Sequence, residues 1–584
     1  TDGRRYQLFF GNTIRDIATF WQCRPVPGHG NLVVSTFAPH HSWPHGAIGL
    51  VQNRLGPEAP RGEGFVSLTP DVPQTHDQSF RWSYRDPYPL SDYQFLVAYG
   101  GGDERGRFTL ELLDFCGNRT PVYEDPEMGC YGPLPIRPRE MPPLPAPIAH
   151  AGKSPDEEVQ WGTVMLADVS RGLPEIERDR IKSIQIMEQM RKMADLSHRA
   201  FDQSPVMGYA SYYAKRCWGR VPIEADGSAY FRVPALREVY FQVLDAEGRE
   251  LHRMTSAIQL MPGETQSCVG CHEPRGSTPP FATGSHNVVP LALRRPAVQP
   301  QLPAWGTDGV VDFVKVVQPV LDKYCVECHS GSNPDAGYDL SGDKTRLFNM
   351  AYDNLLGRSR SYRQHDMAGG QMLPDQAAKE KPLVHFYWLL RTPTAINRPL
   401  WTGSHASRLL DYIDTDHCGR MIPLEDRQRI YAWIDANVPY YATYAHSRPH
   451  SPGYRDLCTD VETGKQSAWY AADFLSVYRR RCESCHGGFP HPNDHGKIWD
   501  GRFAWINFTH PEHSPVLTAH LAKKAGGRGL GTIEDENDGD RGAPSTRALF
   551  ADAEDPDYRS MLEAIRVGRN KMLAHPRADM ANFR

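Results

Sequence analysis

Short apolar runs rich in β-branched and aromatic residues recur through residues 1–131, and clusters of Gly, Pro and Asp separate them. Such runs at regular spacing are typical of strands in an all-β domain. The spacing fits either the blades of a propeller or the strands of a sandwich. The clearest runs are RYQLFF, NLVVSTFA, YQFLVAYG and RFTLELLDF.

A proline-rich segment over 132–150 follows this β region and predicts a stiff, extended linker. Residues 151–293 then combine further strands with one expected helix, PEIERDRIKSIQIMEQMRKMADL. The phrase VPIEADGSAYFRVPA predicts two strands around an Asp-Gly turn. We therefore expect a β-rich middle domain that resembles a sandwich. A second proline-rich stretch, RRPAVQPQLPAWG, begins the next part of the chain.

Helical periodicity dominates the last part of the chain, where one plan occurs twice. An apolar helical face is predicted over 308–324, and a closing helix over 425–438. The run WYAADFLSVYRRR repeats the first element, and 555–573 repeats the second. We therefore expect two mainly helical units, 294–450 and 451–584. The face of the first helix consists of Val311, Val314, Val317, Leu321 and Tyr324.

The pattern Cys-x-x-Cys-His occurs three times in the chain. With 12 Cys and 24 His among 584 residues, random placement would give about 0.01 copies. In this pattern the two thiols attach to haem, and the histidine binds the iron from the proximal side. Three covalently attached c-type haems are therefore predicted. The first, second and third haem motifs are Cys268, Cys271 and His272; Cys325, Cys328 and His329; and Cys482, Cys485 and His486.

Zinc binding is the main alternative interpretation of these motifs. A structural zinc site usually unites two Cys pairs that lie close together, whereas these pairs are far apart and each has its own histidine. A redox dithiol needs no histidine after its second cysteine and would not occur three times. Both alternatives are weaker than covalent haem.

Each haem iron has a second axial position, and its occupant tunes the potential or leaves the iron open to substrate. For the second motif His417 and Met421 both qualify, because they lie just before the closing helix, and His417 is favoured. For the first motif no methionine or histidine stands nearby in a helix-terminal loop, and His286 is the closest candidate. An open or unusually ligated iron at this motif would make it the candidate catalytic centre. The local candidates for the third motif are His510, His513, His575 and Met580.

A more distant ligand source is the loop TFAPHHSWPHG, which holds His40, His41 and His45. Three histidines and a Trp in one β-domain loop suggest a ligand presented across a domain interface. A hydrogen-bonded surface loop is an equally good interpretation.

Composition restricts the function. The net charge is −5, with 65 basic and 70 acidic residues, so the chain has no nucleic-acid footprint. No apolar run approaches the ~18 residues of a membrane span. Because haem is attached covalently outside the cytoplasm, we expect a periplasmic or extracellular protein with a processed N-terminus. The acidic loop 533–542 lacks the final glutamate of an EF-hand, so a solvated loop is favoured over a calcium site.

Six cysteines lie outside the haem motifs. An oxidising compartment permits disulfides among them, and Cys116 and Cys130 are close enough in sequence to form one. Zinc ligation and free buried thiols are the alternatives. The six are Cys23, Cys116, Cys130, Cys217, Cys418 and Cys458.

The sequence resembles the alpha subunit of hydrazine synthase and its wider group of bacterial multihaem relatives. The phrases that carry the resemblance are APHH, VPIEADGSAYFRVPA, PGETQSCVGCHEPR, FTHPEHSPVLTAHLAKKAGGRG and PRADM. The resemblance implies a β-propeller, a middle β domain with one haem, and C-terminal cytochrome c-like domains. Residues 1–131 would form only part of that propeller. A propeller histidine can bind a C-terminal haem in this family, which implies His40 or His41 as the third motif's distal ligand.

Two departures from the family limit what can be transferred. In the family, a tyrosine after the middle-domain motif binds iron while the motif histidine turns to zinc. Here Glu-Pro-Arg-Gly-Ser follows His272, so His272 is predicted to remain an iron ligand, and Cys23 is left as a metal ligand without assigned partners. The haem unit at 308–443 is also additional to the family pattern.

The sequence therefore predicts a periplasmic trihaem c-type cytochrome with a redox partner protein and other subunits. Electrons would pass through the C-terminal haems to a middle-domain haem that acts on a small, nitrogenous molecule. One alternative is a pure electron carrier. Another is a non-catalytic subunit of a complex, with the propeller as its docking surface.

Overall fold

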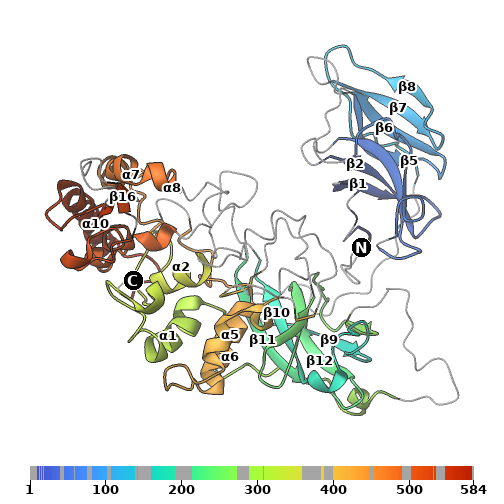
Figure 1. Ribbon diagram of the computed structural model, residues 1–584. Helices are drawn as coiled ribbons and strands as arrows, with labels where there is room; N and C mark the ends of the chain where they lie inside the picture. Colours follow the sequence, from blue (N-terminus) through green and yellow to red (C-terminus); the bar gives the residue numbers. More distant parts are fainter. Residues whose placement is uncertain are drawn as a thin grey trace. The chain divides into compact units, whose positions relative to one another are not determined.

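The computed structural model divides the chain into two compact units (Figure 1). The first unit comprises 1–151 with 272–286 and 394–396, and the second comprises the remainder. The structure describes residues 9–11, 14, 16–17, 19–39, 45–57, 59–74, 82–100, 107–138, 141, 159–191, 213–254, 256–271, 289–304, 306, 308–357, 383–386, 399–400, 402–447, 451–489, 502–530, 532–534 and 546–581.

The first unit contains two four-stranded antiparallel sheets, each with its strands in sequence order. Three of the strands predicted from the sequence, β2, β6 and β7, are confirmed. The run RYQLFF lies mostly outside the described residues. The first sheet consists of β1 (Thr19–Pro25), β2 (Leu32–Ala38), β3 (Ala47–Gln52) and β4 (Phe65–Ser67). The second consists of β5 (Ser83–Pro89), β6 (Gln94–Gly100), β7 (Phe108–Asp114) and β8 (Arg119–Tyr123).

Aromatic packing holds the first sheet together. Phe20 and Phe37 meet edge to face, with ring centroids 5.3 Å apart. Phe37 lies directly over Gly49 of β3, where a Cβ atom would come within 2.1 Å of the ring. A glycine is therefore required at this position, because any side chain would displace the ring from the core.

The expected bridge between Cys116 and Cys130 does not form, since both cysteines are free thiols. Cys116 lies two residues after the end of β7, whereas the amide of Cys130 donates to the carbonyl of Phe108, the first residue of β7. A strand of this length, Phe108–Asp114, separates its ends by about 20 Å. Proximity in sequence therefore does not bring the two thiols together.

The second unit begins with two sheets that form the β-rich middle part. One is antiparallel in the order β11-β10-β13-β14, and the other has the order β12-β9-β15, with β15 parallel to β9. The strands are β9 (Trp161–Leu166), β10 (Ser183–Gln189), β11 (Lys215–Pro222), β12 (Ala229–Pro234), β13 (Val239–Leu244), β14 (Glu250–Arg253) and β15 (Thr265–Cys268).

The Asp-Gly turn predicted in VPIEADGSAYFRVPA is confirmed, and Gly227 adopts a φ of +83° there. The two flanking strands are β11 and β12, as expected. They do not pair with each other, however, because β11 pairs with β10 and β12 pairs with β9. The turn thus carries the chain from one sheet to the other.

The helix predicted over 174–196 is wrong. The described part contains only a short 3-10 turn, η1 (Arg178–Arg180), and then β10. On β10, Ile184 and Ile186 are fully buried, while the intervening Gln185 is also buried and accepts a hydrogen bond from Arg220 at 2.9 Å. Pairing on both edges and burial on both faces override the helical spacing of the apolar residues.

The helices predicted in the last part of the chain are confirmed. A π turn leads directly into an α-helix before the second motif (η4 and α1) and before the third (η7 and α7). The closing helices α6 and α10 pack against these entry helices. The bounds are η4 Phe313–Val317, α1 Gln318–Tyr324, α2 Met350–Gly357, α5 Leu409–Ile413, α6 Leu424–Asp435, η7 Trp469–Phe474, α7 Leu475–Arg481, α8 Glu483–His486, α9 Pro515–Thr518 and α10 Pro556–Ala574.

Shorter elements complete the second unit. A two-stranded antiparallel ribbon joins β16 and β17. The remaining elements are η3 Leu291–Arg294, η5 Asp335–Gly337, η6 Ser404–Ala406, η9 Arg502–Trp505, η10 Pro511–His513, η11 Lys523–Ala525, β16 Thr532–Glu534 and β17 Thr546–Ala548.

The second haem unit is attached to the middle sheet. Figure 1 shows α6 beside β10 and β11. Gln242 of β13 donates to the carbonyl of Asp435 at 2.6 Å, and the carboxylate of Asp435 accepts from the amide of Glu250 at 3.0 Å. One continuous apolar core joins Tyr240 to Trp433. The end of α6 is therefore fixed to the sheet.

A buried ion network joins the C-terminal tail to the second haem unit. Arg577 is 0 % exposed and pairs with Asp579 at 2.6 Å, and it donates to the carbonyls of Thr345 and Arg346. Asp579 also accepts from Tyr440 at 2.5 Å. Burial alone would raise the pKa of Asp579, but the positive charge of Arg577 lowers it well below its usual range.

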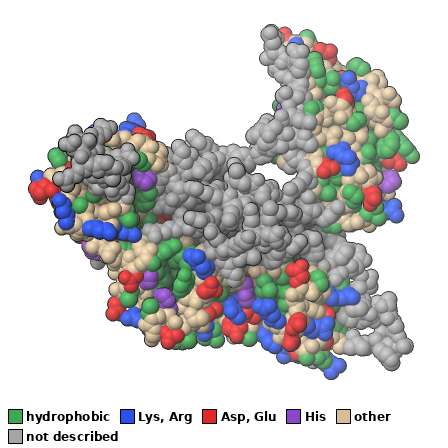
Figure 2. Space-filling view, viewed as in Figure 1, with side chains coloured by type: hydrophobic (Ala, Val, Ile, Leu, Met, Phe, Trp, Pro, Cys, Tyr) green, Lys and Arg blue, Asp and Glu red, His purple; other side chains and the backbone are tan. Residues whose placement is uncertain are grey.

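The described surface carries mixed charge. On the face in Figure 2, acidic and basic side chains are interspersed over the coloured surface. This distribution agrees with the net charge of −5. Among the described helices, none has the length and apolarity that crossing a membrane requires.

We expect Asp579→Asn to lower the free energy of unfolding by about 3–5 kcal/mol, because it leaves the buried Arg577 charge unpaired. The ionised carboxylate stabilises the fold above its ordinary pKa of 3.8, and this stabilisation is lost as the pH falls toward the lowered folded value. Chemical unfolding at pH 7 and at about pH 2, between the ordinary and the lowered pKa, measures both effects. Glu563→Gln on α10 removes only an exposed ion pair and should cost less than about 1 kcal/mol.

Alkylation of the native protein tests the free thiols. We expect Cys23, Cys116 and Cys418 to react, because their residues are exposed, and Cys217 and Cys458 to react only after unfolding. Burial raises the pKa of Cys217 to about 11 and further suppresses its thiolate. Peptide mass spectrometry without reductant gives the readout, and a peptide pair linked through Cys116 and Cys130 would contradict the assignment.

Candidate haem-attachment sites

The second and third haem motifs have the same local structure. Cys325 caps α1 with φ −120° and ψ −39°, and Cys482 caps α7 with φ −122° and ψ −31°. In each motif the histidine amide, of His329 or His486, donates to the carbonyl of the first cysteine at 3.0 Å. The two helices, α1 and α7, thus end in turns of the same conformation. This turn presents two thiols and an imidazole from five consecutive residues.

Close helix packing positions the third motif. The closing helix α10 crosses η7 at Gly568, where a Cβ atom would lie 2.7 Å from the ring of Trp469. Because Gly568 has no side chain, α10 can approach η7 until its backbone contacts the ring of Trp469. In the second haem unit an aromatic pair lies where η4 meets the closing helix α6, with the rings of Phe313 and Trp433 centred 5.0 Å apart.

The structure places His417 opposite His329, as the sequence favours. Their rings are nearly parallel, at 22°, and their centroids are 6.4 Å apart. Two imidazoles bound on opposite sides of one metal ion, with metal–nitrogen bonds of about 2.0 Å, have ring centroids roughly 6.3 Å apart. Nδ1 of His329 is buried without a hydrogen-bond partner among the described residues. Met421, the other candidate, is 58 % exposed.

His520 lies opposite His486, and the sequence analysis did not single it out. The ring centroids are 5.7 Å apart, with an interplanar angle of 54°. Nδ1 of His520 donates to the carbonyl of Leu530 at 2.7 Å. The lone pair of the neutral ring therefore lies on Nε2, where it can bind a metal. Trp505 packs edge to face against His486, with the ring centroids 5.0 Å apart. In the sequence His520 stands in PVLTAHLAKK, two residues after the end of α9.

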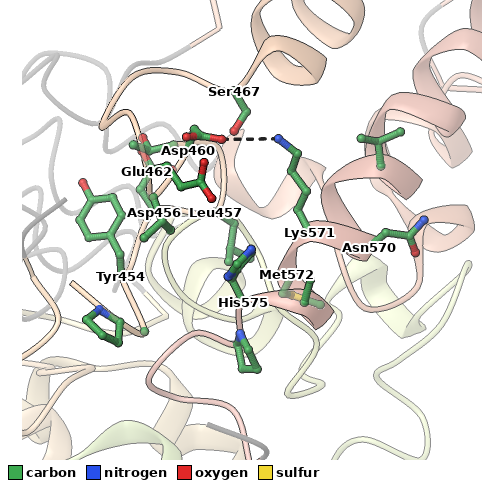
Figure 3. Close-up of a pocket in the computed structure, with 17 residues that line it drawn as sticks. Tyr454, Asp456, Leu457, Asp460, Glu462, Ser467, Asn570, Lys571, Met572 and His575 are labelled. Carbon is green, nitrogen blue, oxygen red and sulfur yellow. Dashed lines mark hydrogen bonds and ion pairs between the residues drawn. The ribbon is translucent and has the colours of Figure 1, made fainter. Parts of the chain in front are cut away.

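The other candidates for the third motif have other partners. His575 follows α10 and lines a cleft of about 850 Å³, in which Lys571 pairs with Asp460 at 3.7 Å (Figure 3). No haem-motif residue lines this cleft. The sulfur of Met580 accepts from the amide of Arg577 at 3.3 Å.

The histidine-rich loop is only partly described. His40 and His41 lie outside the described residues, as do the first motif's His272 and its candidate partner His286. His45 is described, and its Nδ1 lies 2.8 Å from the hydroxyl of Ser83. The sequence-based expectations for the undescribed histidines therefore remain predictions.

The first motif is held by a sheet rather than by a helix. Cys268 ends β15, which runs parallel to β9, and the amide of Cys271 donates to the carbonyl of Arg171 at 3.0 Å. Gly270 passes so close to Arg171 that a Cβ atom would meet its side chain at 2.5 Å. Both cysteines pack against the middle domain's apolar core. This agrees with the β-rich setting expected from the sequence.

The motif thiols are poorly suited to redox exchange or zinc binding. Burial raises the pKa of Cys325 and Cys482 to about 11 and that of Cys271 to about 12. A reactive dithiol requires a lowered pKa. Among the described residues, neither the second nor the third motif brings its two sulfurs and its histidine close enough to bind one ion. Neutral thiols beside an opposed imidazole pair fit covalent haem.

Two other metal-site candidates remain, Cys23 and the acidic loop 533–542. Sγ of Cys23 lies 3.3 Å from the hydroxyl of Ser35 and belongs to no group of potential metal ligands among the described residues. Of the acidic loop 533–542, only Ile533 and Glu534 fall in the described part, where they belong to β16. The calcium prediction therefore lies outside the described residues.

The fold is that of a multidomain protein with several β-sheets and helices that carries three Cys-x-x-Cys-His motifs. Residues 175–273 match the family described as the hydrazine synthase alpha subunit middle domain. This segment, which includes the first motif, therefore belongs to that family, and the resemblance found in the sequence is confirmed.

Known relatives extend the match beyond this domain. Hydrazine synthase subunit alpha of Kuenenia stuttgartiensis is 24 % identical over 457 residues, which cover 61 % of this chain and 53 % of that protein. The chain thus spans about half the length of this curated relative. The solved Kuenenia stuttgartiensis hydrazine synthase aligns with a TM-score of 0.47 and 18 % identity, over 73 % of this chain and 62 % of that chain.

Proposed function

We propose that this protein is an exported multihaem c-type cytochrome that transfers electrons between a partner protein and a redox centre in its middle domain. The observation that carries the proposal is the pair of opposed imidazoles at the second and third motifs. Each pair combines a motif histidine with a histidine from a later segment, His417 or His520. The relationship to hydrazine synthase subunit alpha supports the same class.

The two imidazole pairs assign these motifs to electron transfer. A c-type haem supplies a one-electron iron couple, and nitrogen ligands on both faces close it to substrates. His329 and His486 act as proximal ligands, with His417 and His520 as their distal partners. The carbonyl of Leu530 fixes the tautomer of His520, and packing by Trp505 fixes the ring of His486.

The first motif is the remaining place for chemistry on a small molecule. Cys268 and Cys271 anchor its haem at the edge of a sheet, and His272 serves as proximal ligand. Its setting at the end of β15 differs from the helical setting of the other two. The substrate class, a small nitrogenous molecule, follows from the relative's name alone. A pure electron carrier, or a non-catalytic subunit, is the alternative.

The domain assignment is part of this proposal. Two successive four-stranded antiparallel sheets in the first unit fit two blades of a partial propeller, and 132–150 is the linker after them. Residues 151–293 carry the first haem, while 294–450 and 451–584 are cytochrome c-like domains. A periplasmic location, a redox partner protein and further subunits complete the proposal.

Haem content tests the attachment sites. Produced with a cytochrome c maturation system, the intact chain should carry three haems by mass and by haemochrome absorbance. Cys482→Ala combined with Cys485→Ala should remove one haem. The matched control is Cys116→Ala with Cys130→Ala, which lies outside every motif and should keep all three. A chain without covalent haem would overturn the proposal.

Electron paramagnetic resonance tests the distal ligands. We expect His520→Ala and His417→Ala each to convert one low-spin ferric haem to a high-spin ferric haem, which should bind carbon monoxide after reduction. His575→Ala is the matched control, because His575 lines a separate cleft, and its spectrum should match the native one. Unchanged low-spin signals in His520→Ala would show that another residue binds the third iron.

Carbon monoxide and nitric oxide distinguish the catalytic version from the pure carrier. If the first haem is the reactive centre, reduced native protein should bind one equivalent of either gas, and the Cys268→Ala, Cys271→Ala double variant should bind none. Three low-spin haems that ignore both gases would leave electron transfer as the function.

A further inference from the structure

A second group of potential metal ligands lies apart from the haem motifs. One ligand atom each from Asp343, His510 and His513 lie within 4.8 Å of one another. Asp343 belongs to the second haem unit, whereas the two histidines belong to the third. Within the described part of the chain, no other three His, Cys, Asp or Glu residues converge in this way.

Hydrogen bonds hold the three residues in place. Asn507 donates to Oδ2 of Asp343 at 2.7 Å, and its own Oδ1 accepts from the amide of His510 at 2.8 Å. Two further bonds join the segments beside them. The amide of Lys344 donates to the hydroxyl of Thr509 at 2.9 Å, and the amide of Phe508 donates to the carbonyl of Lys344 at 2.8 Å. The ligand geometry is therefore set by contacts that need no ion.

The electrostatic surroundings favour a cation. Nδ1 of His510 lies 2.8 Å from Oδ2 of Asp343, and the rings of His510 and His513 are centred 5.3 Å apart. Asp339 is only 3 % exposed, and its Oδ2 lacks a hydrogen-bond partner among the described residues. The carboxylate of Asp343 beside two imidazoles forms a set of oxygen and nitrogen donors that a divalent ion can bind.

We propose that Asp343, His510 and His513 bind a divalent transition-metal ion, for which zinc is the probe, at the junction of the second and third haem units. Two imidazoles and one carboxylate suit zinc and its neighbours and leave positions for water. Metal–ligand bonds of about 2.0–2.1 Å put ligand atoms roughly 3.3 Å apart, so His510 and Asp343 need to separate only slightly. His510 is half exposed, which gives the ion a route from solvent.

The bound ion would hold the second and third haem units together. Its ligands come from both, so binding would oppose separation of the segments that carry 343–344 and 507–513. Asp343 precedes α2 in the second haem unit, whereas His510 directly precedes η10 and His513 ends it in the third haem unit. The ion would therefore stiffen the junction. None of its ligands belongs to a haem motif, and the histidine opposite His486 is His520 rather than His510 or His513.

Zinc content of the full-length haem-loaded protein tests the site. After dialysis against a micromolar zinc buffer, Asp343→Asn and His513→Ala should each hold one zinc fewer per chain than the native protein. By calorimetry, the affinity of that zinc should fall at least tenfold. His29→Ala is the matched control, because His29 and Asp92 form an exposed His–Asp pair at 3.4 Å and belong to no group of three potential ligands among the described residues. This variant should bind zinc as the native protein does.

X-ray absorption at the zinc edge separates this site from zinc bound by motif cysteines. Only nitrogen and oxygen neighbours at about 2.0 Å, with imidazole scattering, are expected, whereas sulfur at about 2.3 Å would place zinc at a cysteine motif. Equal zinc content in the native protein, Asp343→Asn and His513→Ala would overturn the proposal. The native spectrum decides the matter even if one variant folds poorly.

Discussion

The pairing of Arg577 with Asp579 is the interaction on which the C-terminal half of the molecule depends. A fully buried guanidinium and a carboxylate are costly unless every polar atom has a partner. Here Arg577 also donates to carbonyls of the 345–348 segment, and Asp579 accepts from Tyr440. The segment that follows α10 in the third haem unit thus holds the 345–348 loop of the second haem unit in place. A second buried pair, Arg346 with Asp456, links the same loop to the start of the third unit.

This locking matters for the proposed electron transfer because His417 and His520, the proposed second iron ligands, come from loops and not from the haem-motif helices. His417 precedes α6, and α6 is bound to the middle sheet through Asp435. His520 follows α9 and is fixed by the carbonyl of Leu530. A loop residue keeps a bond to iron over many turnovers only if its backbone is held, and these contacts hold it. The Asp343–His510–His513 cluster lies on the same junction and would strengthen it further.

The first motif follows a different structural logic. A helix-end motif presents thiols and imidazole from one turn, whereas Cys268 and Cys271 leave a parallel strand and cross the backbone of Arg171 at a glycine. The matched middle domain of the hydrazine synthase alpha family ends at this motif. The chain therefore has one motif that follows a strand and two that end helices, and this difference supports the separate roles proposed for them.

The sequence by itself predicted the three Cys-x-x-Cys-His motifs, the repeated helical plan and the position of His417 just before a closing helix, because these depend on local spacing. The Cys-x-x-Cys-His spacing is one turn of chain, and helical periodicity is likewise local. Tertiary structure decided the rest. It made β10 a strand where the spacing suggested a helix, separated Cys116 from Cys130 along the length of β7, and brought His520 rather than His575 to His486. Each of these outcomes depends on which distant segments pack together, and no local pattern of residues encodes that choice.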